Sequence, residues 1–551
     1  MHFISGFRPR NSIVALRQHW QLILSMLWAI GLIATAYIVY SPVFQTNDDV
    51  TMAMRVHGFG QFASATPYIV YSNILWGVLL YALPSIAGYL AYAWVTMMLM
   101  FCISWGITYF LLRSPVPAGI ALLLCTAVLI EPLLSPQFTV TAGLCAVVCM
   151  LAVQRYRTAP SPWLIGVIVL SALAAILVRI VMLPLVVVLV APYFWLHGRA
   201  LIRQVALVRA VIGIIVFGTC TLVANAVAYQ QQPEVARFHE LYRLYQPLFN
   251  NGAMNFFRLY PELVERSGYS MNDLALMAQR FFVPGSLTDA VPLRNLMSSY
   301  TPVNGEFANF TQVFTSNINQ LSYQPYPFFF AIALMCIALN RDLNAVFGYV
   351  LLALVIVCIC LTGRIVHDRV SYSMMSALLL FAVTHVLAPN WKKIYAWSSI
   401  GALVLALVWS QGTTRTAINQ KASKIHSIFV KDLKNIPTQS FVVWGASAFA
   451  FQQIYPLKAM RDTAVPLGIY TLALSSIQPQ SVAYEQRAAG FDIAQALRSP
   501  EGVLISYPKS FRNGLDTFCR EHYGGPLQEE VFWKGKAITL LRIRCGSSDT
   551  P

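Results

Sequence analysis

Two adjacent carboxylates, Asp48 and Asp49, follow the first long apolar run of the chain. A carboxylate beside a membrane can act as general base toward an acceptor hydroxyl, and a neighbouring acid can orient that hydroxyl. Because consecutive helical residues point about 100° apart, the two acids should not share one proton or one substrate atom. A structural interpretation is also open, since Asn47 can cap a short helix whose first turn favours negative charge.

A second group of residues that could bind a ligand is the turn Arg364-Ile-Val-His367-Asp368-Arg369, which lies between two apolar runs. Two guanidinium groups and an imidazole at this position can bind a lipid phosphate or pyrophosphate bidentately. The alternative is a solvated turn in which Asp368 pairs with a neighbouring arginine. We therefore predict Arg364, His367 and Arg369 as substrate-binding residues, with that alternative left open.

Three further cationic or titratable residues are candidates for the same site. Arg179 lies at the turn between two apolar runs, and Arg55 and His57 follow the acidic pair in sequence. Each is predicted to bind substrate if the fold brings it toward Asp48 and Asp49. A lone arginine at the end of a membrane helix can instead extend its charged group to the interface.

The elements that must position these residues are membrane helices, as the composition indicates. Of 551 residues, 57% are hydrophobic and 11% are charged, against roughly 25% charged in a soluble domain. Mean hydropathy is +0.60. The net charge of +16 does not indicate nucleic-acid binding, because the basic residues separate apolar runs instead of clustering on one segment. The sequence predicts a polytopic α-helical membrane protein in contact with the lipid bilayer.

Eleven apolar runs are predicted to be membrane-spanning helices, because backbone polar groups must be paired within hydrocarbon. The runs cover residues 21–40, 86–112, 115–131, 138–153, 162–178, 180–196, 208–229, 326–340, 343–361, 373–388 and 394–411.

Charge between these runs predicts the orientation. With the N-terminus in the cytoplasm, twelve Arg and Lys residues fall on the inner side and four fall in the short outer loops, as the positive-inside rule requires. The inner residues are Arg8, Arg10, Arg17, Arg113, Arg155, Arg157, Arg199, Arg203, Arg209, Arg341, Lys392 and Lys393, and the outer ones are Arg55, Arg179, Arg364 and Arg369. An odd number of spans then places the C-terminal segment outside.

The predicted organisation is a membrane domain over residues 1–411 and a C-terminal domain over residues 412–551. The membrane domain has two large outer loops, at about 41–85 and 230–326. In the C-terminal domain, expected strands at 440–445, 503–507 and 537–544 surround an expected helix at 491–498, a pattern that predicts a small α/β fold.

Cysteine use agrees with a C-terminal domain outside the cytoplasm. Eight of the ten cysteines lie in apolar runs, whereas Cys519 and Cys545 stand alone in the C-terminal domain. Such a pair suits a disulfide in an oxidising compartment. Two unpaired thiols are the alternative, because the separation in space cannot be read from sequence.

Known motifs for other chemistry are missing from the sequence. No GxGxxG, Walker A, CxxC, HExxH or GxSxG pattern occurs in a convincing structural context. Nucleotide-driven and zinc-dependent reactions therefore have no sequence support.

The complete arrangement resembles the GT-C superfamily of integral-membrane glycosyltransferases. The resemblance consists of one span, an outer loop with an acidic pair, many further spans and a soluble outer C-terminal domain. The segment Thr46-Asn-Asp-Asp49 looks like the acidic first-loop motif of that superfamily. It implies transfer of a sugar from a polyprenyl-phosphate carrier with inversion at the anomeric carbon. Asp48 or Asp49 would then be the base, and outer arginines would hold the donor phosphate.

The resemblance also sets expectations for partners and location. We expect a bacterial cell-envelope glycan or glycolipid as acceptor, on the outer face of the inner membrane. Some members of the superfamily bind a divalent metal through acidic loop residues. We favour no metal and no other cofactor, because no second acidic cluster has metal-ligand spacing. A polysaccharide polymerase or ligase and a lipid-linked-sugar transporter or flippase are the alternative functions.

Overall fold

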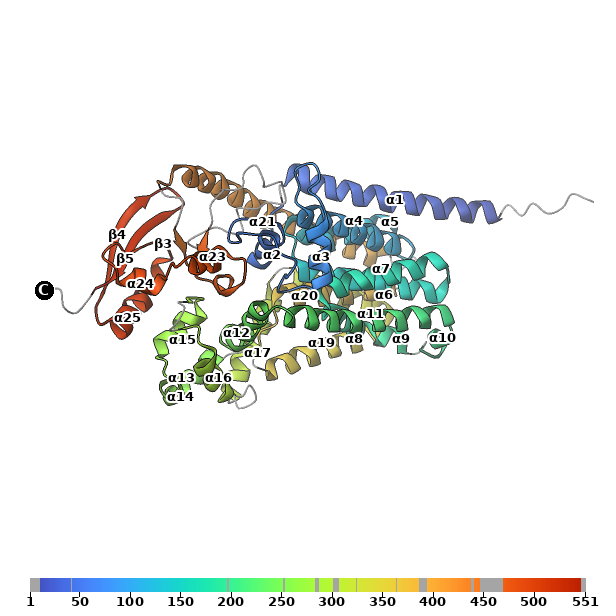
Figure 1. Ribbon diagram of the computed structural model, residues 1–551. Helices are drawn as coiled ribbons and strands as arrows, with labels where there is room; N and C mark the ends of the chain where they lie inside the picture. The colour runs from blue at the N-terminus through green and yellow to red at the C-terminus, as the bar shows by residue number, and fades with distance from the viewer. Residues whose placement is uncertain are drawn as a thin grey trace, which may run out of the picture.

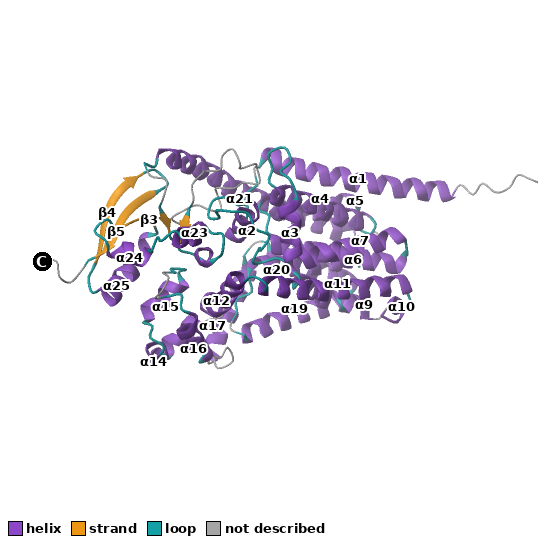
Figure 2. Ribbon diagram, viewed as in Figure 1, coloured by secondary structure: helices purple, strands orange, loops and turns teal. Residues whose placement is uncertain are grey.

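The computed structural model is a bundle of helices with a small sheet at the end of the chain (Figures 1 and 2). It describes residues 10–40, 42–195, 198–250, 253–282, 287–300, 307–323, 325–362, 364–385, 394–437, 441–445 and 469–546. Arg8, Lys392, Lys393, residues 386–388 and residue 440, which enter the sequence predictions, lie outside the described residues.

Six described helices are long and apolar enough to cross a membrane. They are α1 (Arg10–Val39, apolar from His19), α4 (Ala91–Leu112), α6 (Phe138–Thr158), α7 (Pro162–Arg179), α11 (Val205–Gln230) and α19 (Leu343–Leu361). A seventh span results if the bent pair Phe310–Leu321 and Tyr326–Leu339, with an angle of 76° between its helices, is counted as one. These helices fit a polytopic membrane protein.

The prediction of eleven spans is not supported by this criterion. The other five runs are helical, but most are short or interrupted. They form α5 (Ala118–Leu134), α8 (Met182–Val190) with α9 (Pro192–Trp195), α18 (Tyr326–Asn340), α20 (Asp368–Thr384) and α21 (Ile394–Asn435). Helices α5, α18 and α20 have 17 residues or fewer, and the 180–196 run breaks between α8 and α9. In α21 the apolar part is followed by a long polar part.

Helices α6 and α20 form the centre of the bundle, and nearly all their side chains are buried. They approach closely at Gly143, where a Cβ atom would overlap the Ser373 side chain. Small residues allow such close helix contact in membranes. The contact fixes the start of α6, at Phe138, relative to the start of α20, at Asp368.

The two large loops and the C-terminal domain gather at one end of the bundle, opposite the start of α1 (Figure 1). We call this end the loop end. The first loop contains α2 (Asn47–His57) and α3 (Ile74–Ala82). The second loop, which follows α11, contains α12 (Pro233–Asn250), α13 (Ala253–Leu259), α14 (Pro261–Arg266), α15 (Met271–Ala278), α16 (Ala290–Ser298) and α17 (Phe307–Ser322). The short helix α10 (Gly198–Ile202) precedes α11 at the opposite end of the bundle.

The C-terminal domain has a five-stranded sheet in the order β2-β1-β3-β5-β4. The strands are β1 (Val442–Val443), β2 (Tyr470–Thr471), β3 (Val503–Ser506), β4 (Leu527–Lys534) and β5 (Thr539–Cys545). Strand β1 is parallel to β2 and β3, whereas β5 is antiparallel to β3 and β4. The helices are α23 (Val482–Ala488), α24 (Ile493–Arg498) and α25 (Arg512–Tyr523), with short 3-10 turns at Leu474–Ile477 and Lys509–Phe511.

The C-terminal domain shares a hydrophobic core with the second loop. The Phe281 ring lies 4.5 Å from the Trp444 ring and 5.4 Å from the Phe518 ring, between centroids. A disulfide joins Cys519 on α25 to Cys545 on β5, with their Cα atoms 5.2 Å apart. The two regions therefore pack as one structure over the loop end.

Candidate functional site

Helix α2 carries the acidic pair and is held at both ends. It begins at Asn47 with Thr46 as N-cap, so the expectation that Asn47 caps the helix is wrong. The Thr46 hydroxyl instead donates to Asp49, at 2.9 Å. The helix ends at Gly58 with φ +66°, where any Cβ would collide with the backbone of Ala65. This turn requires glycine.

Asp49 faces the helix bundle. Its carboxylate is 2% exposed and accepts hydrogen bonds from the Tyr92 hydroxyl at 2.9 Å and from the backbone N–H of Phe138 at 3.0 Å. Burial raises the pKa of Asp49 from 3.8 to about 7, although these hydrogen bonds act in the opposite direction. Asp49 thus joins α2 to the starts of α4 and α6, and it does not line the cavity described next.

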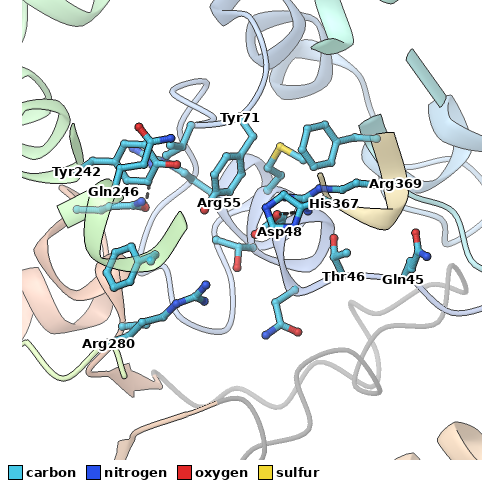
Figure 3. A pocket seen from close by; sticks show the side chains of 18 of the residues that line it. Gln45, Thr46, Asp48, Arg55, Tyr71, Tyr242, Gln246, Arg280, His367 and Arg369 are labelled. Atoms are coloured by element: carbon cyan, nitrogen blue, oxygen red, sulfur yellow. Dashed lines mark hydrogen bonds and ion pairs between the residues drawn. The ribbon is translucent and has the colours of Figure 1, made fainter. Parts of the chain in front are cut away.

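Asp48 faces a cavity of about 580 Å³ at the loop end. Its carboxylate forms an ion pair with Arg369 Nη1 at 2.8 Å, and the two side chains are 21% and 24% exposed. The pair joins α2 to the first turn of α20. Asp48 is consequently the member of the acidic pair that a ligand can reach (Figure 3).

Three parts of the chain enclose this cavity. Its floor is formed by α2 and by the ends of α6, α7 and α20, and one wall by α12 together with Arg280. The C-terminal domain forms another wall through Val443, Gly445, Thr471, Ala473 and Gln478. The cavity therefore lies between the helix bundle and the domains that cover its loop end.

The cavity is strongly cationic. Five arginines line it, against two aspartates, Asp48 and Asp368. The arginines are Arg55, Arg179, Arg280, Arg364 and Arg369. Because a guanidinium group binds phosphate and carboxylate through paired N–H donors, this lining favours an anionic ligand.

Arg179 and Arg369 both lie against one aromatic ring, that of Phe138 at the start of α6. Their guanidinium carbons are 5.8 Å and 6.0 Å from the centre of the Phe138 ring. Arg179 also donates from Nη1 to the backbone carbonyl of Tyr71, at 2.7 Å. These contacts orient both guanidinium groups at the membrane end of the cavity.

The turn before α20 supplies the remaining predicted residues. Arg364 and His367 are exposed and line the cavity. Partial burial and the nearby Arg369 lower the pKa of His367. Asp368 accepts from the Tyr326 hydroxyl at 2.6 Å, whereas Arg369 pairs with Asp48. The Arg369 guanidinium therefore pairs with α2, outside its own turn.

Arg55 lies two helical turns beyond Asp48 and is 1% exposed. Its Nη1 donates to Gln478 Oε1 at 2.7 Å, which connects α2 to the C-terminal domain. The guanidinium lies 5.5 Å from the Phe62 ring and 5.9 Å from the Phe238 ring. Among the described residues, its Nε and Nη2 atoms have no hydrogen-bond partner. Burial lowers the pKa of Arg55 to about 10, so the side chain is charged at neutral pH.

The structure brings together six of the eight predicted site residues on one cavity, namely Asp48, Arg55, Arg179, Arg364, His367 and Arg369. Asp49 and His57 are placed elsewhere. The His57 imidazole accepts from the backbone N–H of Tyr92, at 3.2 Å, and so supports the packing of α2 on α4.

Several lining residues were not predicted from sequence. They include Tyr71, Tyr242, Gln246, Arg280 and Gln478. The alternation of basic and aromatic positions in residues 235–248 is a partial signal for Tyr242. No local pattern distinguishes Arg280 or Gln478, because their roles depend on contacts distant in sequence.

One group in the described part of the chain has metal-ligand geometry. Ligand atoms of Asp273, Glu521 and His522 lie within 4.8 Å of one another. The group lies outside the cavity lining and joins α15 to α25, with His522 Nε2 2.8 Å from Asp273 Oδ1. The expectation of a site without metal stays a prediction.

The chain was compared with protein-family models, with curated proteins and with solved structures, and nothing matched it in any of the three comparisons.

Proposed function

We propose that this membrane protein is a glycosyltransferase that moves a sugar from a polyprenyl-phosphate carrier to a cell-envelope glycan or glycolipid. The observation that carries the proposal is the Asp48–Arg369 pair inside an arginine-lined cavity at the end of a membrane helix bundle. A carboxylate beside clustered cations suits a reaction in which a hydroxyl loses a proton while a phosphate leaves.

In this proposal Asp48 is the general base. The acceptor hydroxyl oxygen attacks the anomeric carbon of the donor sugar from the face opposite the phosphate, and its proton passes to the Asp48 carboxylate. The bond between the anomeric carbon and the phosphate oxygen breaks, and the electron pair leaves with the polyprenyl phosphate. The product has inverted configuration at the anomeric carbon.

The arginines at the membrane end of the cavity hold the departing phosphate. Arg179 and Arg369 are oriented by Phe138 and by their hydrogen bonds, and Arg364 and His367 lie on the same side. Preorganised cations stabilise the charge that develops on the leaving oxygen. When the phosphate binds Arg369, it competes with Asp48 for this guanidinium and frees the carboxylate to accept a proton.

The rest of the cavity suits a sugar. Tyr71 and Tyr242 present aromatic rings, with 6.3 Å between their centroids, and rings of this kind stack on sugar faces. With the N-terminus in the cytoplasm, as the charge distribution predicts, the cavity faces the outer side of the bacterial inner membrane.

The test combines lipid binding with glycan analysis. Full-length protein in nanodiscs should bind undecaprenyl phosphate and not undecaprenol, as measured by native mass spectrometry. Arg369→Gln should weaken binding about tenfold or more, because one charge-assisted contact contributes about 1.5–3 kcal/mol. Arg258→Gln, at an exposed position on α13 outside the cavity, is the matched control. Equal binding of the phosphate and the alcohol would contradict the proposal.

The second candidate is a polysaccharide polymerase or ligase. It is favoured by one observation, namely that the second loop lines the cavity through Tyr242 and Gln246 beside the 364–369 turn. In a cell-surface glycan assay, Asp48→Asn should abolish product if the glycosyltransferase proposal is right. Loss with Arg364→Ala but not with Asp48→Asn would favour the polymerase or ligase. A transporter or flippase would need neither side chain for a covalent step.

A further inference from the structure

Two separated ends of the cavity lie along one face of α2. Asp48 and Arg55 are seven residues apart, which places them on the same face of the helix with about 10 Å between them along its axis. Thr51 and Met52 line the cavity between them. The Asp48–Arg369 pair and Arg55 therefore line different stretches of the cavity.

The charge of Arg55 is not balanced within the described part of the protein. A guanidinium group offers five N–H donors, and the structure gives it one hydrogen bond, to the neutral amide of Gln478. Within the described part of the chain, its Nε and Nη2 atoms are buried without a hydrogen-bond partner, and no carboxylate lies within ion-pair distance. Burying a charge without a counter-ion costs several kcal/mol, and the two aromatic rings compensate only part of that cost.

Arg280 brings a second cation to this part of the cavity. In Figure 3, Arg55 and Arg280 both lie on the side of Asp48 opposite Arg369. Its φ of +64° is unusual for a residue other than glycine and costs about 1–2 kcal/mol. The residues on either side enforce it, because the Trp444 indole donates to the Gln279 carbonyl at 3.1 Å and the Phe281 ring packs on Trp444.

We propose that Arg55 and Arg280 form a second anion subsite, which binds a carboxylate or phosphate group on the sugar acceptor. The inference rests on the proposed function and deepens it, because it makes the acceptor an acidic glycan. If Asp48 takes the proton of the acceptor hydroxyl, the acceptor lies on the side of Asp48 away from the donor phosphate. Arg55 and Arg280 occupy that side.

The C-terminal domain then has a defined role. Gln478 holds the guanidinium of Arg55, and Trp444 fixes the backbone beside Arg280. Both contacts come from the domain that covers the cavity. The domain is therefore a part of the acceptor site and positions its two cations.

The experiment measures the binding of acidic and neutral forms of one sugar to the full-length protein in nanodiscs. The probes are trigalacturonate and its methyl ester for a carboxylate, and mannose 6-phosphate and mannose for a phosphate. We expect the acidic form of at least one pair to bind about tenfold or more tightly at low salt, equivalent to about 1.4 kcal/mol. The pair with the larger ratio identifies the acidic group.

Variants connect this preference to the two arginines. Arg280→Gln should reduce the acid-to-neutral ratio toward one, and Arg55→Lys, which retains charge but loses the planar donor set, should reduce it severalfold. Arg369→Gln should leave the ratio unchanged while it weakens undecaprenyl phosphate binding. Arg258→Gln should change neither. Because Arg280 is exposed, its variant tests the proposal even if Arg55→Lys does not fold.

Three results would overturn the inference. The first is equal binding of the acidic and neutral probes by the wild-type protein. The second is a preference that persists in Arg280→Gln and in folded Arg55→Lys. The third is that Arg280→Gln lowers binding of undecaprenyl diphosphate relative to monophosphate, which would assign the subsite to the donor. An acid preference without lipid-phosphate binding would refute the proposed function and leave the subsite intact.

Discussion

The cavity face and the bundle face of α2 place adjacent acids in opposite surroundings. Asp48 lines a cationic cavity and pairs with Arg369. Asp49, the next residue, is buried and accepts hydrogen bonds from Tyr92 and Phe138. The sequence alone therefore does not identify which of the two adjacent acids a ligand can reach. The helix decides this, because it turns each residue toward a different face.

The largest effect on sugar transfer is expected when Asp48 alone is replaced. Asp48→Asn removes the proposed base, and we expect sugar transfer to fall by roughly 10²–10⁴-fold with no loss of thermal stability. Glycan product and the unfolding midpoint of the purified protein measure the two quantities. Glu262→Gln, at an exposed position on α14, is the control for loss of one negative charge. Full activity in Asp48→Asn would show that Asp48 is not the base.

The opposite pattern is expected at Asp49. Asp49→Ala leaves the Tyr92 hydroxyl and the Phe138 N–H buried without an acceptor, at about 1–3 kcal/mol for each group. The unfolding midpoint should therefore fall, whereas Asp48→Ala should leave it nearly unchanged. Differential scanning fluorimetry compares the two variants. Equal midpoints would show that Asp49 does not anchor α2.

The comparison extends to two ion pairs. Arg369–Asp48 faces the cavity, whereas Arg415–Glu131 lies in the helix packing, with side chains only 20% and 9% exposed. Breaking a buried pair costs more than breaking a partly exposed one. Arg415→Gln should lower the unfolding midpoint more than Arg369→Gln, which should lower lipid-phosphate binding instead. The reverse order would contradict our assignment of the two surfaces.

The smallest effect concerns pH. Burial raises the folded-state pKa of Asp49 from 3.8 to about 7, so the folded protein binds this proton more tightly than the unfolded chain. The resulting stability is fully present below pH 3.8 and is lost as pH rises to about 7. The unfolding midpoint of the wild type should therefore fall relative to Asp49→Asn over this range. A constant difference between the two proteins would show that Asp49 does not titrate there.

Local patterns in the sequence indicate the features that depend on local structure. Apolar runs identified helices, and Ser270 with Asp273 three residues later has the spacing of the capping box that the structure contains at the start of α15. The number of spans was overestimated, because hydropathy does not show the break between α8 and α9 or the shortness of α20.

The composition of the cavity could be predicted only in part. Charge near the ends of apolar runs identified Asp48, Arg179 and Arg369. Gln478 could not be found in this way, because its partner Arg55 is 423 positions away. Arg280 acquires its position from the packing of Phe281 on Trp444, a contact between two regions that pattern analysis treats separately.

Helix α21 determines how the C-terminal wall of the cavity is placed relative to the helix bundle. Its 42 residues span about 63 Å, and Arg415 fastens it to Glu131 while Asp432 accepts from the backbone N–H of Ile538 at 3.1 Å. The helix thus couples the orientation of the C-terminal domain rigidly to the helix bundle. Inserting one residue between positions 420 and 428 would turn the C-terminal domain by about 100°. Gln478 would then lose its hydrogen bond with Arg55. Seven inserted residues would nearly restore the angle but lift the domain by about 10 Å.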